Sequence, residues 1–204
     1  MLVKILGCGT STGVPIPGCT CSVCSSSDPR NARMRTSALV TLDSGKNLLI
    51  DTSTDLRHQV LKWNVTHIDA VLFTHFHSDH ILGLDDLRGF NFVQQGPIPC
   101  FGTRKTLEEL ERIFPYAFKS PHDYQGGLLV QLDFHEISPP QPFTVFETEI
   151  IPFSLMHGNL PVTGFRIGPF AYATDCNHIP EASKHILRGV PYLILDALRS
   201  EPHA

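Results

Sequence analysis

The chain has 204 residues, of which 42% are hydrophobic and 18% charged, and its formal net charge is −4 at neutral pH. This composition is typical of one globular domain and excludes a disordered or membrane-like chain. The net charge argues against a broadly basic surface for nucleic acid, and no apolar run approaches the roughly 18 residues that span a bilayer. Gly7 interrupts the first ten residues, which indicates a strand rather than a signal peptide. We therefore expect a cytoplasmic protein that binds neither membrane nor nucleic acid.

Short apolar runs between turn signals predict strands, and apolar residues at helical spacing predict helices. In chain order the predicted strands are 2–6, 37–42, 47–51, 68–74, 98–102, 128–134, 143–153, 162–168, 170–175 and 192–197, and the predicted helices are 53–63, 104–114 and 180–189. Hairpin-connected strands early in the chain and interleaved helices later indicate an α/β sandwich with its helices outside. We expect one domain over 1–204 with an insertion at about 17–35.

The sequence FTHFHSDH places His75, His77, Asp79 and His80 directly after the predicted strand 68–74. Buried polar groups need partners, so three imidazoles and a carboxylate this close together do not suit an apolar core. Imidazole and carboxylate are ligands for zinc, manganese or iron. The cluster therefore predicts a metal site, and the alternative is a surface loop that happens to be rich in histidine.

His157 and Asp175 are further ligand candidates: His157 follows the predicted strand 143–153 and precedes a turn-rich segment, and Asp175 ends the predicted strand 170–175. Taken alone, His157 suits a loop histidine and Asp175 suits a helix cap. A metal site needs ligands from more than one strand, so the cluster at 75–80 favours ligation by both residues.

Cysteines 19, 21 and 24 form a C-x-C-x-x-C pattern. They are too closely spaced to pair comfortably with one another, but they can occupy three corners of a tetrahedral zinc site. The alternative is a group of three reduced surface thiols. We interpret Cys8, Cys100 and Cys176 as ordinary apolar or half-buried thiols.

The motifs THFHSDH, MHG and ATD, in this order, resemble the metallo-β-lactamase superfamily. The resemblance implies an αββα sandwich with two catalytic metals, zinc or manganese. His75, His77 and His157 would hold one metal, Asp79 and His80 would hold the other, and Asp175 would bridge them. Two adjacent metals can share a hydroxide that attacks phosphorus, and Asp79 would help to position this nucleophile.

The stretches LGCGTSTGVPIPGCTCSVC, RMRTSALV and LLIDTSTDL resemble the PhnP-like phosphodiesterases. This implies a small cyclic ribosyl or nucleotide-like phosphodiester as substrate and a structural zinc on Cys19, Cys21 and Cys24. The alternatives are a non-catalytic PqqB-like metal-binding or carrier protein and a ribonuclease Z-like nuclease. The intact HxHxDH motif disfavours the first, and the charge balance disfavours the second. Arg88 is either an anion contact or an exposed helix arginine, and a homodimer is compatible with the sequence.

Compared with that family, the chain ends before the segment that supplies a general acid, the last ligand of the second metal and the fourth ligand of the structural zinc. His203 lies close to where the acid would fall. We therefore expect a fold without its last helix and strand, either because the chain is truncated or because a partner chain completes the sites. Reduced occupancy of the second metal and little turnover are the expected consequences.

Overall fold

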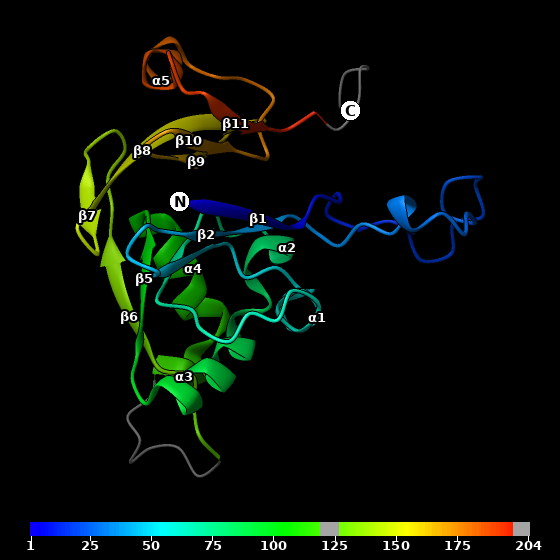
Figure 1. Cartoon of the computed structure of the whole chain (residues 1–204), viewed down its shortest axis with the longest axis horizontal. Helices are drawn as coiled ribbons and strands as arrows, with labels where there is room; N and C mark the ends of the chain where they lie inside the picture. The colour runs from blue at the N-terminus through cyan, green and yellow to red at the C-terminus, as the bar shows by residue number, and fades with distance from the viewer. Residues whose placement is uncertain (119–126, 198–204) are drawn as a thin grey trace. The chain divides into compact units, whose positions relative to one another are not determined.

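The computed structural model describes residues 1–118 and 127–197. The chain divides into two compact units, Met1–Glu136 and Ile137–Ala204, and each unit is built on its own β-sheet (Figure 1). The single domain predicted over 1–204 and the insertion at about 17–35 stay predictions.

The first unit contains a six-stranded sheet with the strands in sequence order, β1-β2-β3-β4-β5-β6. Its strands are β1 (Leu2–Gly7), β2 (Ser37–Thr41), β3 (Asn47–Ile50), β4 (Ala70–Leu72), β5 (Ile98–Gly102) and β6 (Leu132–Glu136). Its helices are α1 (Leu56–Lys62), α2 (Ser78–Ile81), α3 (Arg88–Gln94) and α4 (Arg104–Ile113), with short 3-10 turns η1 (Pro29–Asn31), η2 (Leu84–Leu87) and η3 (Pro115–Phe118). Strands β1 to β3 pair antiparallel, whereas β3 to β6 pair parallel.

One face of this sheet forms the core of the first unit together with the helices. Leu39, Leu49 and Val71 pair across β2, β3 and β4, so their side chains lie on the same face. They join a buried cluster with Leu56 of α1 and Leu110 of α4. Full burial of each such side chain stabilises the unit by about 1.5–3 kcal/mol.

The parallel pairing determines where the polar residues of the first unit gather. Because β3, β4 and β5 run in the same direction, their carboxyl ends lie along one edge of the sheet. Asp51 follows β3, His75 follows β4, and Thr103 follows β5. Polar side chains that are distant in sequence are thereby brought to the same edge.

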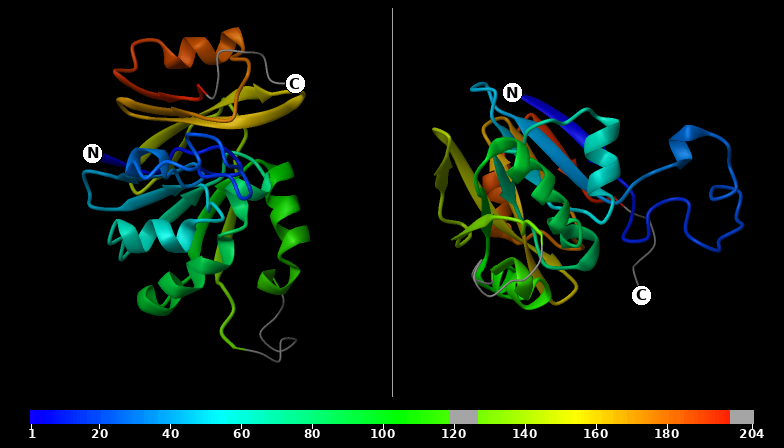
Figure 2. Two further views of the ribbon diagram at one scale, coloured as in Figure 1. Left: turned by 90° about the vertical axis from the view of Figure 1, so that its right-hand side faces the viewer. Right: turned by 90° about the horizontal axis from the view of Figure 1, so that it is seen from below.

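Over residues 137–197, the second unit contains a five-stranded sheet of order β11-β10-β9-β8-β7 and one helix, α5 (Figure 2). Its strands are β7 (Phe143–Val145), β8 (Thr148–His157), β9 (Leu160–Ile167), β10 (Phe170–Ala173) and β11 (Tyr192–Leu195), and α5 spans Glu181–Leu187. Neighbouring strands from β7 to β10 pair antiparallel, and β11 joins β10 in parallel. Ile186 and Leu187 of α5 pack on Phe153 and Ala173.

The predicted strands and helices are present, with differences at their boundaries. The run 143–153 is two strands rather than one, because Phe146 and Glu147 turn the chain at positive φ angles of 47° and 63°. The predicted strand 128–134 begins later, at Leu132, because the Asn91 side chain hydrogen-bonds to both backbone groups of Gln131. Helices α2 and α3 were not predicted from the sequence.

Candidate metal centre

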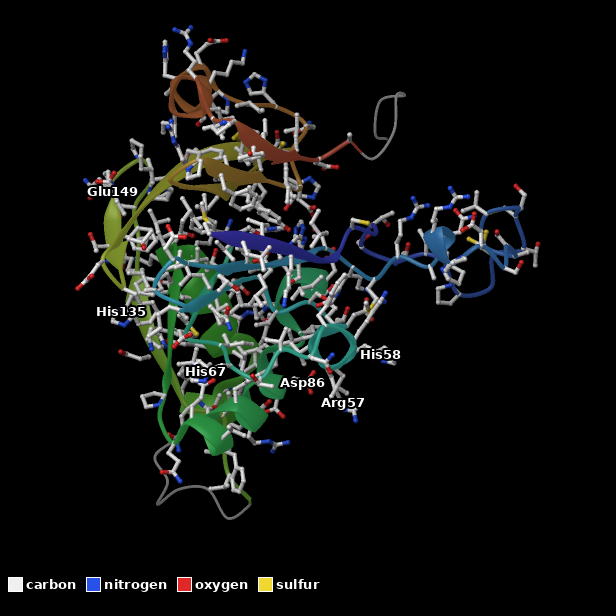
Figure 3. The ribbon with its side chains drawn as sticks, viewed as in Figure 1. Arg57, His58, His67, Asp86, His135 and Glu149 are labelled. Carbon is white, nitrogen blue, oxygen red and sulfur yellow. The ribbon has the colours of Figure 1, made fainter. Side chains whose placement is uncertain are left out.

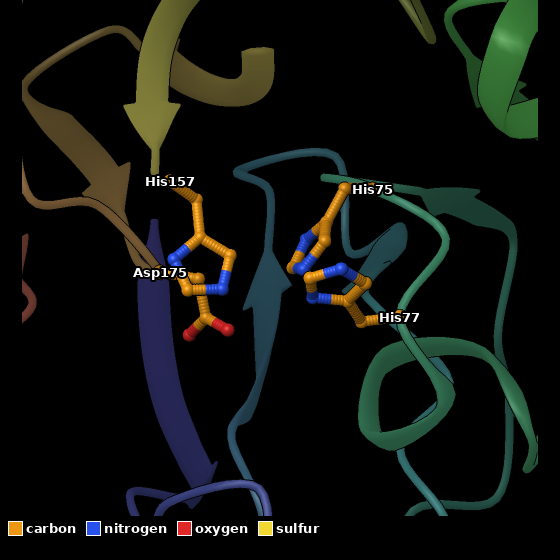
Figure 4. Close-up of side chains that lie close together, drawn as sticks. All are labelled: His75, His77, His157 and Asp175. Carbon is orange, nitrogen blue, oxygen red and sulfur yellow. The ribbon is translucent and has the colours of Figure 1, made fainter. Parts of the chain in front are cut away.

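The first unit brings His75, His77, Asp79 and His80, hereafter the histidine–aspartate cluster, to the carboxyl end of β4. His75 follows the strand, and the four-residue helix α2 carries Asp79 and His80. The ring centroid of His75 lies 4.6 Å from that of His77 and 4.2 Å from that of His80. Figure 4 shows the rings of His75 and His77 at close range. The Nε2 atom of His80 lies 3.4 Å from Oδ2 of Asp79.

Asp51 supports this cluster from the end of β3. The side chains of Asp51 and His80 are completely buried, and Oδ2 of Asp51 lies 2.7 Å from Nδ1 of His80. The same carboxylate accepts hydrogen bonds from the backbone N–H and the hydroxyl of Thr74, each at 2.8 Å. Burial raises the pKa of the Asp51 carboxyl, and the facing His80 and the Thr74 donors oppose that rise.

These contacts determine which imidazole nitrogens can face a metal. With Nδ1 of His80 on Asp51, Nε2 is the atom left for a ligand. Nδ1 of His75 likewise lies 3.0 Å from the Thr74 hydroxyl, which leaves its Nε2 for the same role. Carboxylate or hydroxyl partners behind ligating histidines are a regular feature of protein metal sites. The donor set of the cluster therefore fits a divalent metal.

The second unit holds His157, the last residue of β8, and Asp175, two residues beyond β10. A nitrogen of His157 and a carboxylate oxygen of Asp175 lie within 4.8 Å of each other (Figure 4). Asp175 has a φ angle of 56°, and Asp51 in the first unit has one of 62°. A left-handed backbone is uncommon outside glycine and clusters at functional sites. Both predicted ligands of the second unit are thus held together at the ends of their strands.

The Sγ atoms of Cys19, Cys21 and Cys24, hereafter the cysteine clip, lie within 4.8 Å of one another. All six cysteines of the chain are free thiols. The backbone N–H of Cys24 donates to Sγ of Cys21 at 3.5 Å. This bond, followed by a contribution from Cys19, lowers the pKa of Cys21 to about 7. Three thiols of which one ionises near neutral pH are chemically suited to zinc.

The remaining cysteines follow the sequence interpretation only in part. Cys100 is buried and Cys176 is half-buried. Burial raises the pKa of both thiols, that of Cys176 to about 11. The interpretation of Cys8 as an apolar or half-buried thiol was wrong, because Cys8 is exposed. It directly follows Gly7, where β1 ends and the chain leaves the sheet.

Other histidines of the first unit have structural partners outside the cluster. His67 pairs with Asp69 at 3.0 Å, and His135 pairs with Asp133 at 2.9 Å. The ring of His135 also stacks on Phe101 at 4.8 Å. Figure 3 shows His67 and His135 at separate positions on the first unit. It also shows Asp86 close to Arg57; burial raises the pKa of the Asp86 carboxyl. Among the described residues, neither His67 nor His135 belongs to a group of donor atoms close enough together to hold a metal.

Two further predicted residues have different outcomes. The Arg88 side chain is half exposed at the start of α3 and lies 3.3 Å from Asp85, which matches the alternative of an exposed helix arginine. It lines a cavity of about 230 Å³ with Asn91, Phe92 and Leu128. His203 lies outside the described residues.

Sequence reasoning did not single out Asp51. Its signal was the stretch LLIDTSTD, in which a carboxylate directly follows an apolar run. The sequence alone could not show that this strand lies beside β4, and that neighbourhood is what places Asp51 behind His80.

The helices in the described part of the chain include none with the length and apolar character to cross a membrane.

Comparison with known proteins identifies the family. The model of the beta-lactamase superfamily domain matches residues 46–204. A crystal structure described as a new diphosphatase from the PhnP family is 42% identical, with a TM-score of 0.89 over 98% of this chain and 75% of that chain. Zn²⁺-bound PqqB from Methylobacterium extorquens shares the fold at a TM-score of 0.73 and 23% identity, over 95% of this chain and 72% of that one.

An octanoyltransferase of Porphyromonas gingivalis is 39% identical over 195 residues, which cover 96% of this chain. The chain spans only 39% of the length of that relative. The relative's name therefore does not assign an activity to the matched segment. The family model, the diphosphatase structure and the mixed α/β fold with two sheets agree with one another. The chain belongs to the metallo-β-lactamase superfamily of hydrolases, in its PhnP-like branch.

Proposed function

We propose that this chain is a metal-dependent hydrolase of small phosphodiesters, with a cyclic ribosyl or nucleotide-like diester as the substrate class. The observation that carries the proposal is the buried Asp51–His80 pair behind the histidine–aspartate cluster. A buried carboxylate that holds one imidazole nitrogen is useful when the other nitrogen ligates a metal. The similarity to a PhnP-family diphosphatase supports phosphorus as the centre of reaction.

We propose the following metal ligands from the donor chemistry of the two units and from the family resemblance. His75, His77 and His157 would hold one metal, Asp79 and His80 would hold the other, and Asp175 would serve both. Zinc and manganese suit these nitrogen and oxygen donors. Bound there, two divalent metals would polarise the phosphoryl oxygens and lower the pKa of a water molecule.

The contribution of the chain's own residues is to hold the donors in one orientation. Asp51 favours the tautomer of His80 with its proton on Nδ1, in which Nε2 is the nitrogen that can ligate. The Thr74 hydroxyl lies between the Asp51 carboxylate and Nδ1 of His75 and can fix that ring in the same way. These residues are buried and hydrogen-bonded before substrate arrives, which reduces reorganisation during the reaction. Asp79 is the residue that we assign to positioning the attacking water.

The cysteine clip has a separate role in this proposal. It lies in the segment between β1 and η1 rather than at the end of β4, and its donors are thiols instead of imidazoles. Closed sites built from thiolates are typical of structural zinc. We propose that Cys19, Cys21 and Cys24 bind one structural zinc. The cytoplasmic location and the homodimer stay predictions.

Hydrolysis of bis(p-nitrophenyl) phosphate tests the proposed reaction. We expect slow release of p-nitrophenol, in keeping with the reduced occupancy expected at the second metal, that stops after chelation and returns after addition of Mn²⁺ or Zn²⁺. A thioester and a lactone serve as matched substrates without phosphorus, and cleavage of these alone would assign the chain to another branch of the superfamily. Metal retained without cleavage of any ester would favour a PqqB-like carrier. Tight, salt-sensitive binding of tRNA would favour a ribonuclease Z-like nuclease.

A further inference from the structure

A lysine of helix α4 contacts the phenylalanine that lies within the sequence of the histidine–aspartate cluster. Nζ of Lys105 lies 5.2 Å from the centroid of the Phe76 ring. Phe76 stands between the two histidines of the motif, and its ring meets that of His77 edge to face at 5.7 Å. Two successive contacts thus connect an exposed ammonium group to an imidazole that we assign to a metal.

The topology explains why this lysine lies there. Helix α4 begins directly after β5, with Thr103 as its N-cap. Strand β5 runs parallel to β4, so the start of α4 and the cluster occupy the same edge of the sheet. Lys105, in the first turn of α4, is therefore placed at the edge where a substrate of the cluster would bind. Its aliphatic stem can pack on Phe76 while its charge stays in solvent.

Lys105 differs from the arginines nearby in the sequence in whether a carboxylate pairs with its charge. Arg104 pairs with Glu136 at 3.1 Å, and Arg112 pairs with Glu109 at 2.8 Å. Within residues 1–118 and 127–197, Lys105 forms no ion pair with a carboxylate. The aromatic face attracts the ammonium but does not neutralise it. A positive charge is therefore left available beside a site assigned to anionic substrates.

We propose that Lys105 is a specificity-determining residue that binds a second anionic phosphate adjacent to the reacting one. This narrows the proposed substrate class to its nucleotide-like members: the preferred substrate would be a diester of diphosphate, with a second charged phosphate beside the reacting one, rather than a cyclic diester of a single phosphate. This inference rests on the proposed function, because it assumes that the reacting phosphate binds at the cluster. An ammonium group suits this role as a compact point charge with three rotatable donors.

A matched pair of ligands separates this role from a purely structural one. Diphenyl phosphate carries one charged phosphate, and P1,P2-diphenyl diphosphate carries two. Calorimetric titration of the metal-loaded chain with each ligand compares the unaltered protein with Lys105→Met and Lys105→Arg. Methionine keeps an apolar stem on Phe76 without the charge, whereas arginine keeps the charge. Lys62→Met is the control, because Lys62 is exposed in the last turn of α1, at the far end of its helix from the β3 edge.

For Lys105→Met we expect the Kd of diphenyl diphosphate to rise about tenfold, the effect of one lost hydrogen bond to a charged group. The Kd of diphenyl phosphate should change less than about twofold, and Lys105→Arg should restore diphosphate binding because the charge is kept. Lys62→Met should leave both values unchanged. An equal loss for both ligands, or no loss for the diphosphate, would overturn the proposal.

Turnover of bis(p-nitrophenyl) phosphate by the unaltered chain, measured in parallel, keeps the two proposals apart. If this ester is not cleaved but Lys105→Met still weakens the binding of diphenyl diphosphate alone, the proposed reaction is wrong and the proposed role of Lys105 stands. If the ester is cleaved but the Kd of diphenyl diphosphate is the same with and without the Lys105 side chain, the proposed reaction stands and the proposed role of Lys105 is wrong.

Discussion

Nδ1 of His80 and Oδ2 of Asp51 lie 2.7 Å apart, and both side chains are fully buried. Asp51 also accepts two hydrogen bonds from Thr74, so its carboxylate is held from two directions. The pair connects the ends of β3 and β4 and sets which nitrogen of His80 faces outward. Metal affinity should therefore depend on a residue that ligates no metal.

Replacing Asp51 by asparagine should weaken metal binding about 10- to 100-fold, because partners behind metal ligands typically contribute this much. Competition with a chelating indicator measures the affinity for Zn²⁺ and Mn²⁺. Asp43→Asn is the matched control, since the side chain of Asp43 is 89% exposed in the β2–β3 turn. Unchanged affinity in Asp51→Asn, with the fold intact by circular dichroism, would refute the supporting role.

A methyl side chain at Gly83 should destabilise the fold, whereas the same side chain at Gly89 should not. A Cβ atom at Gly83 would lie 2.1 Å from the carbonyl oxygen of Ser53 and 2.8 Å from Cβ of Leu56. Gly83→Ala should therefore lower the free energy of unfolding by about 1–3 kcal/mol, as overpacking does. A Cβ at Gly89, in α3, meets nothing within 4 Å. Gly89→Ala should be neutral or stabilising by up to about 1 kcal/mol.

Urea denaturation of the two glycine variants provides the comparison. If Gly83→Ala and Gly89→Ala are equally stable, the prediction is wrong. The backbone at Gly83 and Ser53 can then move apart to accommodate a Cβ atom. The Gly83 variant should also lose metal affinity, because its N–H donates to the carbonyl of Thr52, next to Asp51.

Thiol reactivity should distinguish Cys21 from the buried cysteines in the metal-free protein. Its pKa of about 7 lies below the ordinary value, so about half of Cys21 is thiolate at pH 7. Cys176, with a pKa of about 11, remains protonated. Mass spectrometry after brief treatment with iodoacetamide should find Cys21 modified first. Lowering the pH to 5 should slow that reaction about 50-fold as the thiolate is protonated.

Zinc added before the iodoacetamide should protect Cys21, since a ligating thiolate is no longer free to react. Equal labelling of Cys21 and Cys176 at pH 7 would contradict the electrostatic description of the clip.

Loss of one clip thiol should remove one zinc per chain. Cys24→Ser should lower the zinc content by one equivalent and reduce the Tm, because binding free energy of structural zinc is folding free energy. Cys8→Ser is the control, since Cys8 is an exposed thiol outside the clip. Elemental analysis and thermal unfolding provide both readouts. A Cys24→Ser protein with unchanged zinc content would show that the three thiols form no metal site.

The strands and the donor residues of the site were predictable from the sequence because they depend on local patterns. Short apolar runs define β2, β3 and β5, and HFHSDH places four side chains that suit the same kinds of metal within six residues. Helix α3 was missed because Gly89 and aromatic residues give its sequence a weak helical propensity.

The contacts between distant segments could not be predicted in this way. The position of Asp51 behind His80 depends on β3 pairing with β4, and the reach of Lys105 to Phe76 depends on β5 pairing with β4. A single sequence carries no direct record of strand order. Cys8 was misjudged for the same reason, because its exposure depends on where the chain leaves the sheet after β1.

The most direct test of the proposed chemistry is the rate of bis(p-nitrophenyl) phosphate hydrolysis by the Mn²⁺-loaded chain and by its His77→Ala variant. The His77 side chain is only half-buried, so its removal should spare the fold. We predict that the variant remains folded and loses at least about 100-fold in rate, in keeping with the loss of a residue that organises metal and water. A folded His77→Ala protein that hydrolyses the ester at the rate of the unaltered chain would contradict the assignment of this cluster as the catalytic metal centre.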